Sequence, residues 1–353
     1  MKAYIKSFSL ISPSPSFEEV LQVSAQIEYN SQYLTCIEPN YKSYINPTLI
    51  RRMSRVVKMG VTVALRCLKD AGIENPDAII AGTGLGCIED TEKFLNEIII
   101  NKEQFLPPTS FIQSTHNTIA GQIALLLKCN SYNYAYVHRN FSFENALLDA
   151  LMMLHEEENK NILLGGVDEI TAVSYEIMKR LGIYKSVEGL TTNVFINPTE
   201  GSIAGEGASC LLLSDKKENA IALINGVKTF VNPETSEEIN KQINEFLKSH
   251  ELTPEDIDNI IMGYNSDSRY DVIYNSVEKE LFPNKNILYY KHLCGDYFTS
   301  SAFAVCMAAY ILKIKQISPA IIFKKGNEAV PKHILIYNQF SGQEHSLILL
   351  SGC

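Results

Sequence analysis

The chain has 353 residues, of which 46% are hydrophobic and 20% are charged, and its formal net charge is −9. This composition is ordinary for a globular protein, and the length allows two domains or one large two-part core. The acidic balance, with no run of more than two lysines or arginines, excludes nucleic acid as the main partner. No apolar stretch reaches the roughly 18–20 residues of a membrane span and no leader sequence is recognisable, so we expect a cytoplasmic protein.

Short apolar runs alternate with amphipathic segments along the first part of the chain. The helix predicted at 142–158 has the clearest pattern, because Phe143, Ala146 and Leu147 begin an i, i+3, i+4 series that continues to Leu154. Strands are predicted at 3–11, 78–82, 132–137, 161–165 and 209–214, and helices at 48–71, 90–100, 118–129, 142–158 and 172–181.

The second part of the chain repeats this plan. Strand 286–291 leads through a polar elbow into a helix that is apolar nearly all round, which copies the arrangement of 132–158. We therefore expect an α/β protein with two duplicated βαβ halves, residues 1–216 and 217–353. Further strands are predicted at 220–228, 259–263, 318–324, 333–339 and 345–350, and helices at 235–249, 270–282 and 298–313.

The segment "YVHRNFSFENALLDALMML" (136–154) reads as the end of a strand, a tight elbow and a helix. Such an elbow is typical of a strand that delivers a nucleophile to a helix N-terminus. The elbow, however, contains His138, Arg139, Asn140 and Ser142, and no cysteine. The eight cysteines of the chain form no CxxC pair and are predicted to be free thiols in a reducing compartment.

Several stretches together resemble the β-ketoacyl synthases of the thiolase superfamily. The resemblance implies a layered α/β/α/β/α core, a dimer formed through the first half, an acyl carrier protein or acyl chain as partner, and no cofactor. The stretches are "NPTLIRRMSRVVKMGVTVALRCLKDAGI" (46–73), "GTGLGCIEDTEKFL" (82–95), "GGVDEI" (165–170), "GEGASCLLLS" (205–214) and "NQFSGQEHSLILL" (338–350).

The resemblance also implies where a catalytic cysteine and two histidines would stand. A condensing enzyme of this family needs a thiolate at a helix N-terminus, where the helix dipole lowers the thiol pKa. Here the cysteine position falls on Asn140, the first histidine position on or beside Gly263, and the second on Asp296, while Lys291 is retained. All three reacting groups are therefore predicted to be absent from otherwise recognisable surroundings.

Each of these residues also has a structural interpretation. Asn140 is expected to cap the helix that follows it. Asp296 is expected to pair with Lys291, or with His138 or Arg139, in one buried pocket between the elbow 138–142 and the segment 291–296. Phe340 corresponds to the phenylalanine that gates the acyl pocket of ketosynthases.

Two residues offer a displaced nucleophile. Ser142 could be activated by His138, although it lies past the tip of the elbow. Cys294 and His292 form a second pair, which an extended elbow would place on the same side.

Two functions of different class follow from these patterns. In the first, the chain is a catalytically degenerate subunit similar to a chain-length factor, which pairs with an active ketosynthase or forms a homodimer. It would act in fatty acid or polyketide (aryl-polyene-type) chain elongation. In the second, it is an active 3-oxoacyl-[acyl-carrier-protein] synthase or acyltransferase that uses a displaced nucleophile and base.

Overall fold

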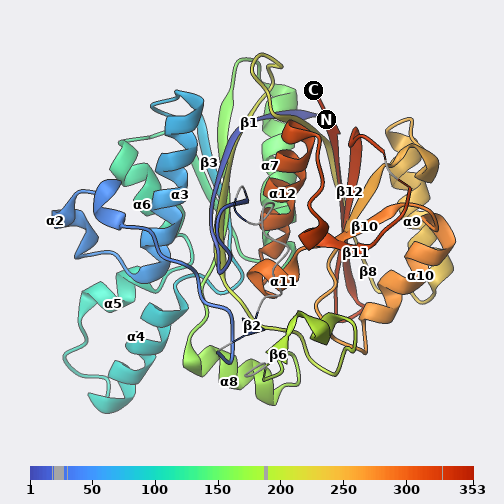
Figure 1. Cartoon of the computed structure of the whole chain (residues 1–353). Coiled ribbons are helices and arrows are strands. Elements are labelled where there is room, and N and C mark those ends of the chain that lie inside the picture. The colour runs from blue at the N-terminus through green and yellow to red at the C-terminus, as the bar shows by residue number, and fades with distance from the viewer. Residues whose placement is uncertain (18, 20–27, 30, 187–189, 328) are drawn as a thin grey trace.

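The computed structural model describes residues 1–353 apart from 18, 20–27, 30, 187–189 and 328 (Figure 1). The first part of the chain contains β1 (Ala3–Ile11), β2 (Glu28–Tyr29), α2 (Pro47–Ile50), α3 (Arg55–Ala71), β3 (Ala78–Gly82), α4 (Ile88–Ile100), α5 (Pro108–Gln113), α6 (Thr118–Leu127), β4 (Tyr132–Tyr136), α7 (Ser142–Glu156), β5 (Asn161–Asp168), α8 (Ala172–Arg180), β6 (Leu190–Thr191) and β7 (Gly207–Ser214). The second part contains β8 (Ala222–Val231), α9 (Ser236–Ser249), β9 (Asn259–Met262), α10 (Asp271–Leu281), β10 (Asn286–Tyr289), α11 (Lys291–Cys294), α12 (Ser300–Ile314), β11 (Ile322–Lys324), β12 (His333–Phe340) and β13 (Glu344–Gly352).

Eleven strands form one mixed sheet in which each half of the chain contributes the same strand order. Outward from β1 the order is β7, β5, β3, β4, and outward from β8 it is β13, β12, β9, β10, with β11 added at that edge. Strand β3 is parallel to β4 and β5, and β9 is likewise parallel to β10 and β12. The predicted duplication is confirmed. The division at residue 216 falls in the connection between β7 and β8 and stays a prediction.

A short joint holds the two halves of the sheet together. Strand β1 pairs with β7 along Tyr4–Ile11, but it pairs with β8 only through Ala3, Tyr4 and Ile5. Beyond this joint the halves of the sheet separate and enclose α7 and α12 (Figure 1). Helices α3 and α6 cover one outer face, and α9 and α10 cover the other (Figure 1). The layered α/β/α/β/α arrangement expected from the sequence is therefore correct.

Each helix layer buries its own apolar cluster against the sheet. Phe143 and Leu147 of α7 pack with Val305 of α12 in the central cluster. Twelve of the fifteen residues of α12 are buried, as its continuous apolar sequence predicts. Within the described residues, none of the helices is long and apolar enough to span a membrane.

The strand expected at 318–324 begins only at Ile322, because Pro319–Ile321 form a 3₁₀ turn, and two further predicted elements differ from the structure. The helix expected at 48–71 is broken, because α2 ends at Ile50 and a second helix begins after Ser54, whose extended backbone (ψ 172°) interrupts the turn. The strand expected at 286–291 ends at Tyr289, because Lys291 already begins the one-turn helix α11. No proline or glycine marks either break in the sequence.

Candidate functional site

The elbow between β4 and α7 is held closed by Ser142. The Ser142 hydroxyl accepts a hydrogen bond from the backbone N–H of His138 at 2.8 Å, and its side chain is fully buried. The ring of His138 stacks on Phe141, with centroids 5.6 Å apart, and both His138 and Arg139 are exposed. The expectation that His138 or Arg139 fills a buried pocket is therefore wrong. Ser142 acts here as a turn-closing acceptor.

Asn140 does not cap the helix, contrary to the sequence prediction. A 3₁₀ turn (Arg139–Phe141) precedes α7, so that Phe141 takes the N-cap position and makes no side-chain capping bond. The buried amide of Asn140 instead donates from Nδ2 to Oε2 of Glu344 at 2.8 Å. Asn140 thus ties the elbow to the first residue of β13.

Lys291 and Asp296 form the buried ion pair that the sequence predicts. Lys291 Nζ lies 2.7 Å from Asp296 Oδ1, and the two side chains are 3% and 8% exposed. The other carboxylate oxygen accepts from Asn265 Nδ2 at 2.9 Å. Gly295 makes this geometry possible, because its φ of 75° ends α11 and turns the chain so that Asp296 returns to Lys291.

Gly263 lies at the end of β9 with no room for a side chain. A Cβ atom at this position would lie 2.1 Å from Asn338 Oδ1 and 2.6 Å from the hydroxyl of Tyr274. Asn338 and Tyr274 therefore occupy the space beside the position that the family resemblance assigns to a histidine. Asp271, eight residues further on, accepts from the backbone N–H groups of Asn265 and Ser266, and burial raises its pKa to about 7.

Glu144 is a buried carboxyl group in this region that the sequence reasoning missed. Burial raises its pKa to about 7, against the opposing effects of hydrogen bonds from Ser301 and Ser346 and of the Lys291 charge. The Ser346 hydroxyl donates to Glu144 Oε1 at 3.0 Å. The only signal in the sequence was an acidic residue next to the apolar series that begins at Phe143. Through Glu144 the first turn of α7 meets the first turn of α12, whereas the pocket expected between the elbow 138–142 and the segment 291–296 stays a prediction.

Cys294 and His292 do not form a reactive pair. Both lie in α11 and not in an extended elbow, so the predicted same-side arrangement is wrong. Burial raises the pKa of the Cys294 thiol, whose Sγ contacts the carbonyl oxygens of Tyr290 and Gly295. The His292 ring stacks on Tyr289 at 3.7 Å, and its Nε2 lies 3.0 Å from the Ala320 carbonyl oxygen. A buried neutral thiol is a poor nucleophile.

Phe340 stands at the end of a tight hairpin. It pairs with Glu344 across a three-residue connection in which Ser341 and Gly342 have positive φ angles, and its ring lies 6.3 Å from that of Phe298. Phe298 also packs against Gly84, where an added Cβ would lie 2.2 Å from its ring. The "GTGLG" stretch (82–86) is therefore a tightly packed turn.

The site as a whole is a packed polar cluster. It holds one buried cation, Lys291, among the carboxyl groups of Asp296, Glu144 and Asp271. The hydroxyls of Tyr290, Ser300 and Ser301 adjoin it, with Ser301 interacting with Glu144 and Ser300 with Tyr290. Among the residues whose placement is described, no group of three or more histidine, cysteine or acidic side chains could hold a metal ion. The arrangement can position polar groups, but it presents neither a thiolate nor an imidazole pair.

Comparisons with known proteins give a family match over part of the chain and matches of fold over all of it. Residues 29–192 match the family described as beta-ketoacyl synthase, N-terminal domain. A comparison with curated proteins gives no match.

Three solved structures share the fold over the whole chain. A beta-ketoacyl synthase from Burkholderia phymatum STM815 superposes with a TM-score of 0.86 at 15% identity, covering 100% of this chain and 99% of that one. The ishigamide ketosynthase/chain length factor superposes with a TM-score of 0.81 at 17% sequence identity, with the same coverage of both chains. The AntDE:AntF complex, a type II PKS acyl-carrier protein with its ketosynthase bound to the hexaketide, gives 0.81 at 14%, again covering 100% and 99%. The fold of this chain is therefore the thiolase-like fold of ketosynthases.

Proposed function

We propose that this chain is a catalytically degenerate, ketosynthase-like subunit that pairs with an active ketosynthase in carrier-protein-dependent chain elongation. The observation that carries the proposal is the structural use of all three reacting positions. Asn140 donates a hydrogen bond to Glu344, and Asp296 forms an ion pair with Lys291. Asn338 leaves no space for a side chain at Gly263. The proposed pathway type is fatty acid or polyketide synthesis, including aryl-polyene-type chains.

The chemistry of decarboxylative condensation supports this proposal. The reaction needs a nucleophile that carries the acyl chain, and the Asn140 amide forms no thioester. It also needs hydrogen-bond donors for the enolate that develops when malonyl loses its carboxylate. An ionised Asp296 accepts hydrogen bonds only, and its charge repels the malonyl carboxylate. The buried Lys291 is already satisfied by Asp296.

The surface around β4 supports a partner subunit. Strand β4 is an edge strand of the sheet, so its outer backbone groups are open to a further strand. Exposed apolar side chains gather on it and on the neighbouring helix α6, including Leu125 (72% exposed), Tyr134 (50%) and Val137 (43%). An obligate interface built on this face is expected to bury more than about 2,000 Å². The partner is a ketosynthase, or a second copy of the chain when no ketosynthase is present.

Co-expression with candidate ketosynthases tests the pairing. We expect one ketosynthase to co-purify as a stable heterodimer by native mass spectrometry, and the acyl product to appear only when both chains are present. Tyr134→Glu should abolish the heterodimer, because it places a charge at the centre of the apolar edge. Val272→Glu is the matched control, since Val272 is also exposed (56%) but lies on α10 at the opposite side of the molecule (Figure 1). A monomer under every condition would contradict the proposal.

Intact-mass measurement separates this function from an active enzyme with a displaced nucleophile. Incubation with acyl-CoA or acyl-carrier protein should leave the mass of the chain unchanged, while an intact ketosynthase treated in parallel gains the acyl group. Ser142 is engaged in closing the elbow, and the Cys294 thiol is buried and protonated. An adduct that maps to either residue would overturn the degenerate function and favour an acyltransferase.

A further inference from the structure

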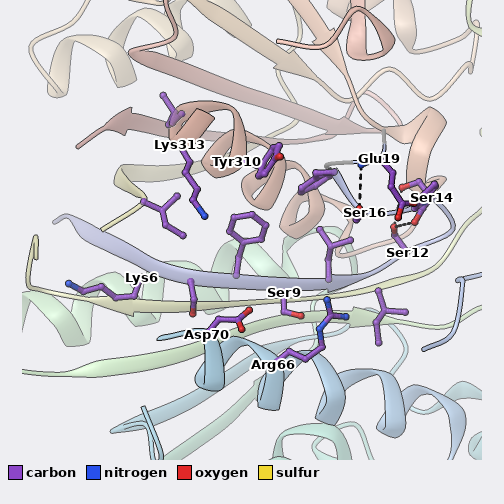
Figure 2. A pocket seen from close by; sticks show the side chains of 18 of the residues that line it. Lys6, Ser9, Ser12, Ser14, Ser16, Glu19, Arg66, Asp70, Tyr310 and Lys313 are labelled. Atoms are coloured by element: carbon purple, nitrogen blue, oxygen red, sulfur yellow. Dashed lines mark hydrogen bonds between the residues drawn. The ribbon is translucent and has the colours of Figure 1, made fainter. Parts of the chain in front are cut away.

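A cavity of about 1020 Å³ lies along β1, away from the Lys291–Asp296 cluster (Figure 2). Its wall on α12 is formed by Tyr310, Leu312 and Lys313, at the C-terminal end of that helix, whereas Lys291 precedes the N-terminal end. Since α12 has fifteen residues, its two ends are about 22 Å apart. The cavity is therefore a separate feature of the molecule.

The cavity exists because β1 loses one of its neighbours. Strand β8 pairs with β1 only as far as Ile5, and the cavity follows β1 from Lys6 onward. Along this stretch the edge of β1 that faces away from β7 has no strand partner among the described residues. A ligand in the cavity can thus contact both faces of the strand, the one that faces α12 and the one that faces α3 (Figure 2).

The face toward α12 is aromatic. Phe8, Phe17 and Tyr310 pack around one another, with ring centroids 6.2 Å apart for Phe8 and Phe17 and 5.6 Å apart for Phe17 and Tyr310. Leu10 and Ile221 extend the apolar surface. Flat or linear hydrocarbon binds well to such a surface, because its burial removes apolar area from water.

The face toward α3 offers groups suited to an anion. The Ser9 hydroxyl has no hydrogen-bond partner in the described structure, although Ser9 is only 4% exposed. Arg66 extends from α3 toward β1 on the side of Ser9 (Figure 2) and pairs with no carboxylate among the described residues. The guanidinium lies 5.9 Å from the centroid of the Tyr44 ring but has no carboxylate partner in the described part of the chain, so that it and the buried hydroxyl both gain free energy from a bound acceptor.

The charge around the cavity is opposite to that of the whole chain. The basic side chains of Lys6, Arg66, Lys313 and Lys315 line it, against the acidic side chains of Asp70 and Glu19. The whole chain carries a net charge of −9. This local basic excess favours a negatively charged ligand and disfavours a cationic one.

We propose that this cavity binds an amphipathic carboxylate, with its hydrocarbon body on the aromatic face and its carboxylate at Arg66 and Ser9. The hydrocarbon covers Phe8 and Tyr310, and the carboxylate passes the free edge of β1 to reach the guanidinium. The site would hold a free acyl or aryl acid away from the polar cluster. It does not depend on the function proposed above.

Isothermal titration calorimetry with decanoate tests the site. We expect one molecule of decanoate to bind per chain, and decyltrimethylammonium, which has the same tail and a positive head, to bind at least tenfold more weakly. Comparing the affinity of 2-naphthoate with that of decanoate tells whether the site prefers a planar or a linear hydrocarbon. Arg66→Gln should weaken decanoate binding about tenfold or more, and Ser9→Ala should weaken it severalfold. Arg51→Gln, an exposed arginine outside the cavity, is the matched control and should leave binding unchanged.

A fluorescence titration provides an independent readout. The chain contains no tryptophan, so Tyr310→Trp introduces a single reporter in the cavity wall. Its emission should shift on adding decanoate and stay constant with decyltrimethylammonium. Failure of both acids to bind, equal affinity for the cationic analogue, or an Arg66→Gln variant that binds as the parent chain does would each overturn the proposal.

Discussion

Asp296→Ala is expected to destabilise the fold strongly, because it strips the buried Lys291 of its partner. The ammonium group lies 2.7 Å from the carboxylate, and the Lys291 side chain is only 3% exposed. Removing one member of such a pair costs about 3–5 kcal/mol, since the remaining charge stays away from water. The Asn265 amide also loses its acceptor, which adds about 1 kcal/mol.

Two nearby carboxyl groups reduce the loss of stability expected for Asp296→Ala. Glu144 and Asp271 both interact electrostatically with Lys291, and burial raises the pKa of each to about 7. In the variant their ionised forms offset part of the lost attraction. We therefore expect about 3–5 kcal/mol in total for Asp296→Ala near pH 8, and a larger loss below pH 7, where Glu144 and Asp271 are protonated.

Urea unfolding followed by circular dichroism measures the effect. The free energy of unfolding should fall by about 1 kcal/mol less in Asp296→Asn than in Asp296→Ala, because the asparagine keeps an acceptor for the Asn265 amide. The double change Lys291→Met with Asp296→Leu should recover most of the loss, because it removes both charges. Glu74→Ala, an exposed carboxylate, is the control and should stay within about 0.5 kcal/mol of the parent chain. A loss below about 1 kcal/mol for Asp296→Ala, or a double variant as unstable as the single one, would refute the reasoning.

Three further outcomes follow from the described contacts. Asn140→Cys should not decarboxylate malonyl-carrier protein in a CO₂-release assay, because both histidines are still missing; turnover well above the parent chain would mean that other groups replace them. Gly263→Ala should lower the urea midpoint by the equivalent of about 1–3 kcal/mol, because the methyl group meets Asn338 at 2.1 Å, whereas Gly121→Ala, with nothing within 4 Å, should not. Burial lowers the pKa of His292 to about 3, so the unfolded chain binds an extra proton between about pH 6.5 and 3, and stability is lost as the pH falls through this window. The difference between the parent chain and His292→Phe in acid unfolding should therefore grow to as much as about 5 kcal/mol toward pH 3, and parallel acid profiles would contradict this assignment.

The spacing of apolar residues along the sequence predicted the two central helices and the sides that they bury. The apolar series of α7 is buried from Phe143 to Leu154, and α12 is buried nearly throughout, as their sequences indicate. The breaks around Ser54 and Lys291 were missed because they arise from tertiary packing and carry no proline or glycine. The repeated strand order could be expected from the repeated pattern of elements, whereas the pairing of β1 with β8 could not.

The part of the candidate site that could be predicted is the buried ion pair, because a buried carboxylate needs a cation beside it. Asp296 had to find a cation in a buried position, and Lys291 was the nearest one in the sequence. Asn140 was predicted as a helix cap because asparagine favours that position. The 3₁₀ turn before α7 places its side chain away from the helix N-terminus, and it donates instead to Glu344, more than 200 residues later in the chain. Glu144 escaped notice because no spacing rule links one acidic residue to the serines of a distant helix.

The central placement of α12 has a consequence during synthesis. Helix α7 leaves the ribosome about 160 residues before the end of α12, which completes its cover. At a translation speed of about 5–20 residues per second, the nascent first half waits roughly 8–30 s with the part of α7 that faces α12 still exposed, although β3 and β5 of its own half can already cover the rest. During this time the chain is exposed to aggregation with its neighbours on the same messenger. We therefore expect the yield of folded protein to depend on holdase chaperones and on the rate at which the second half is translated.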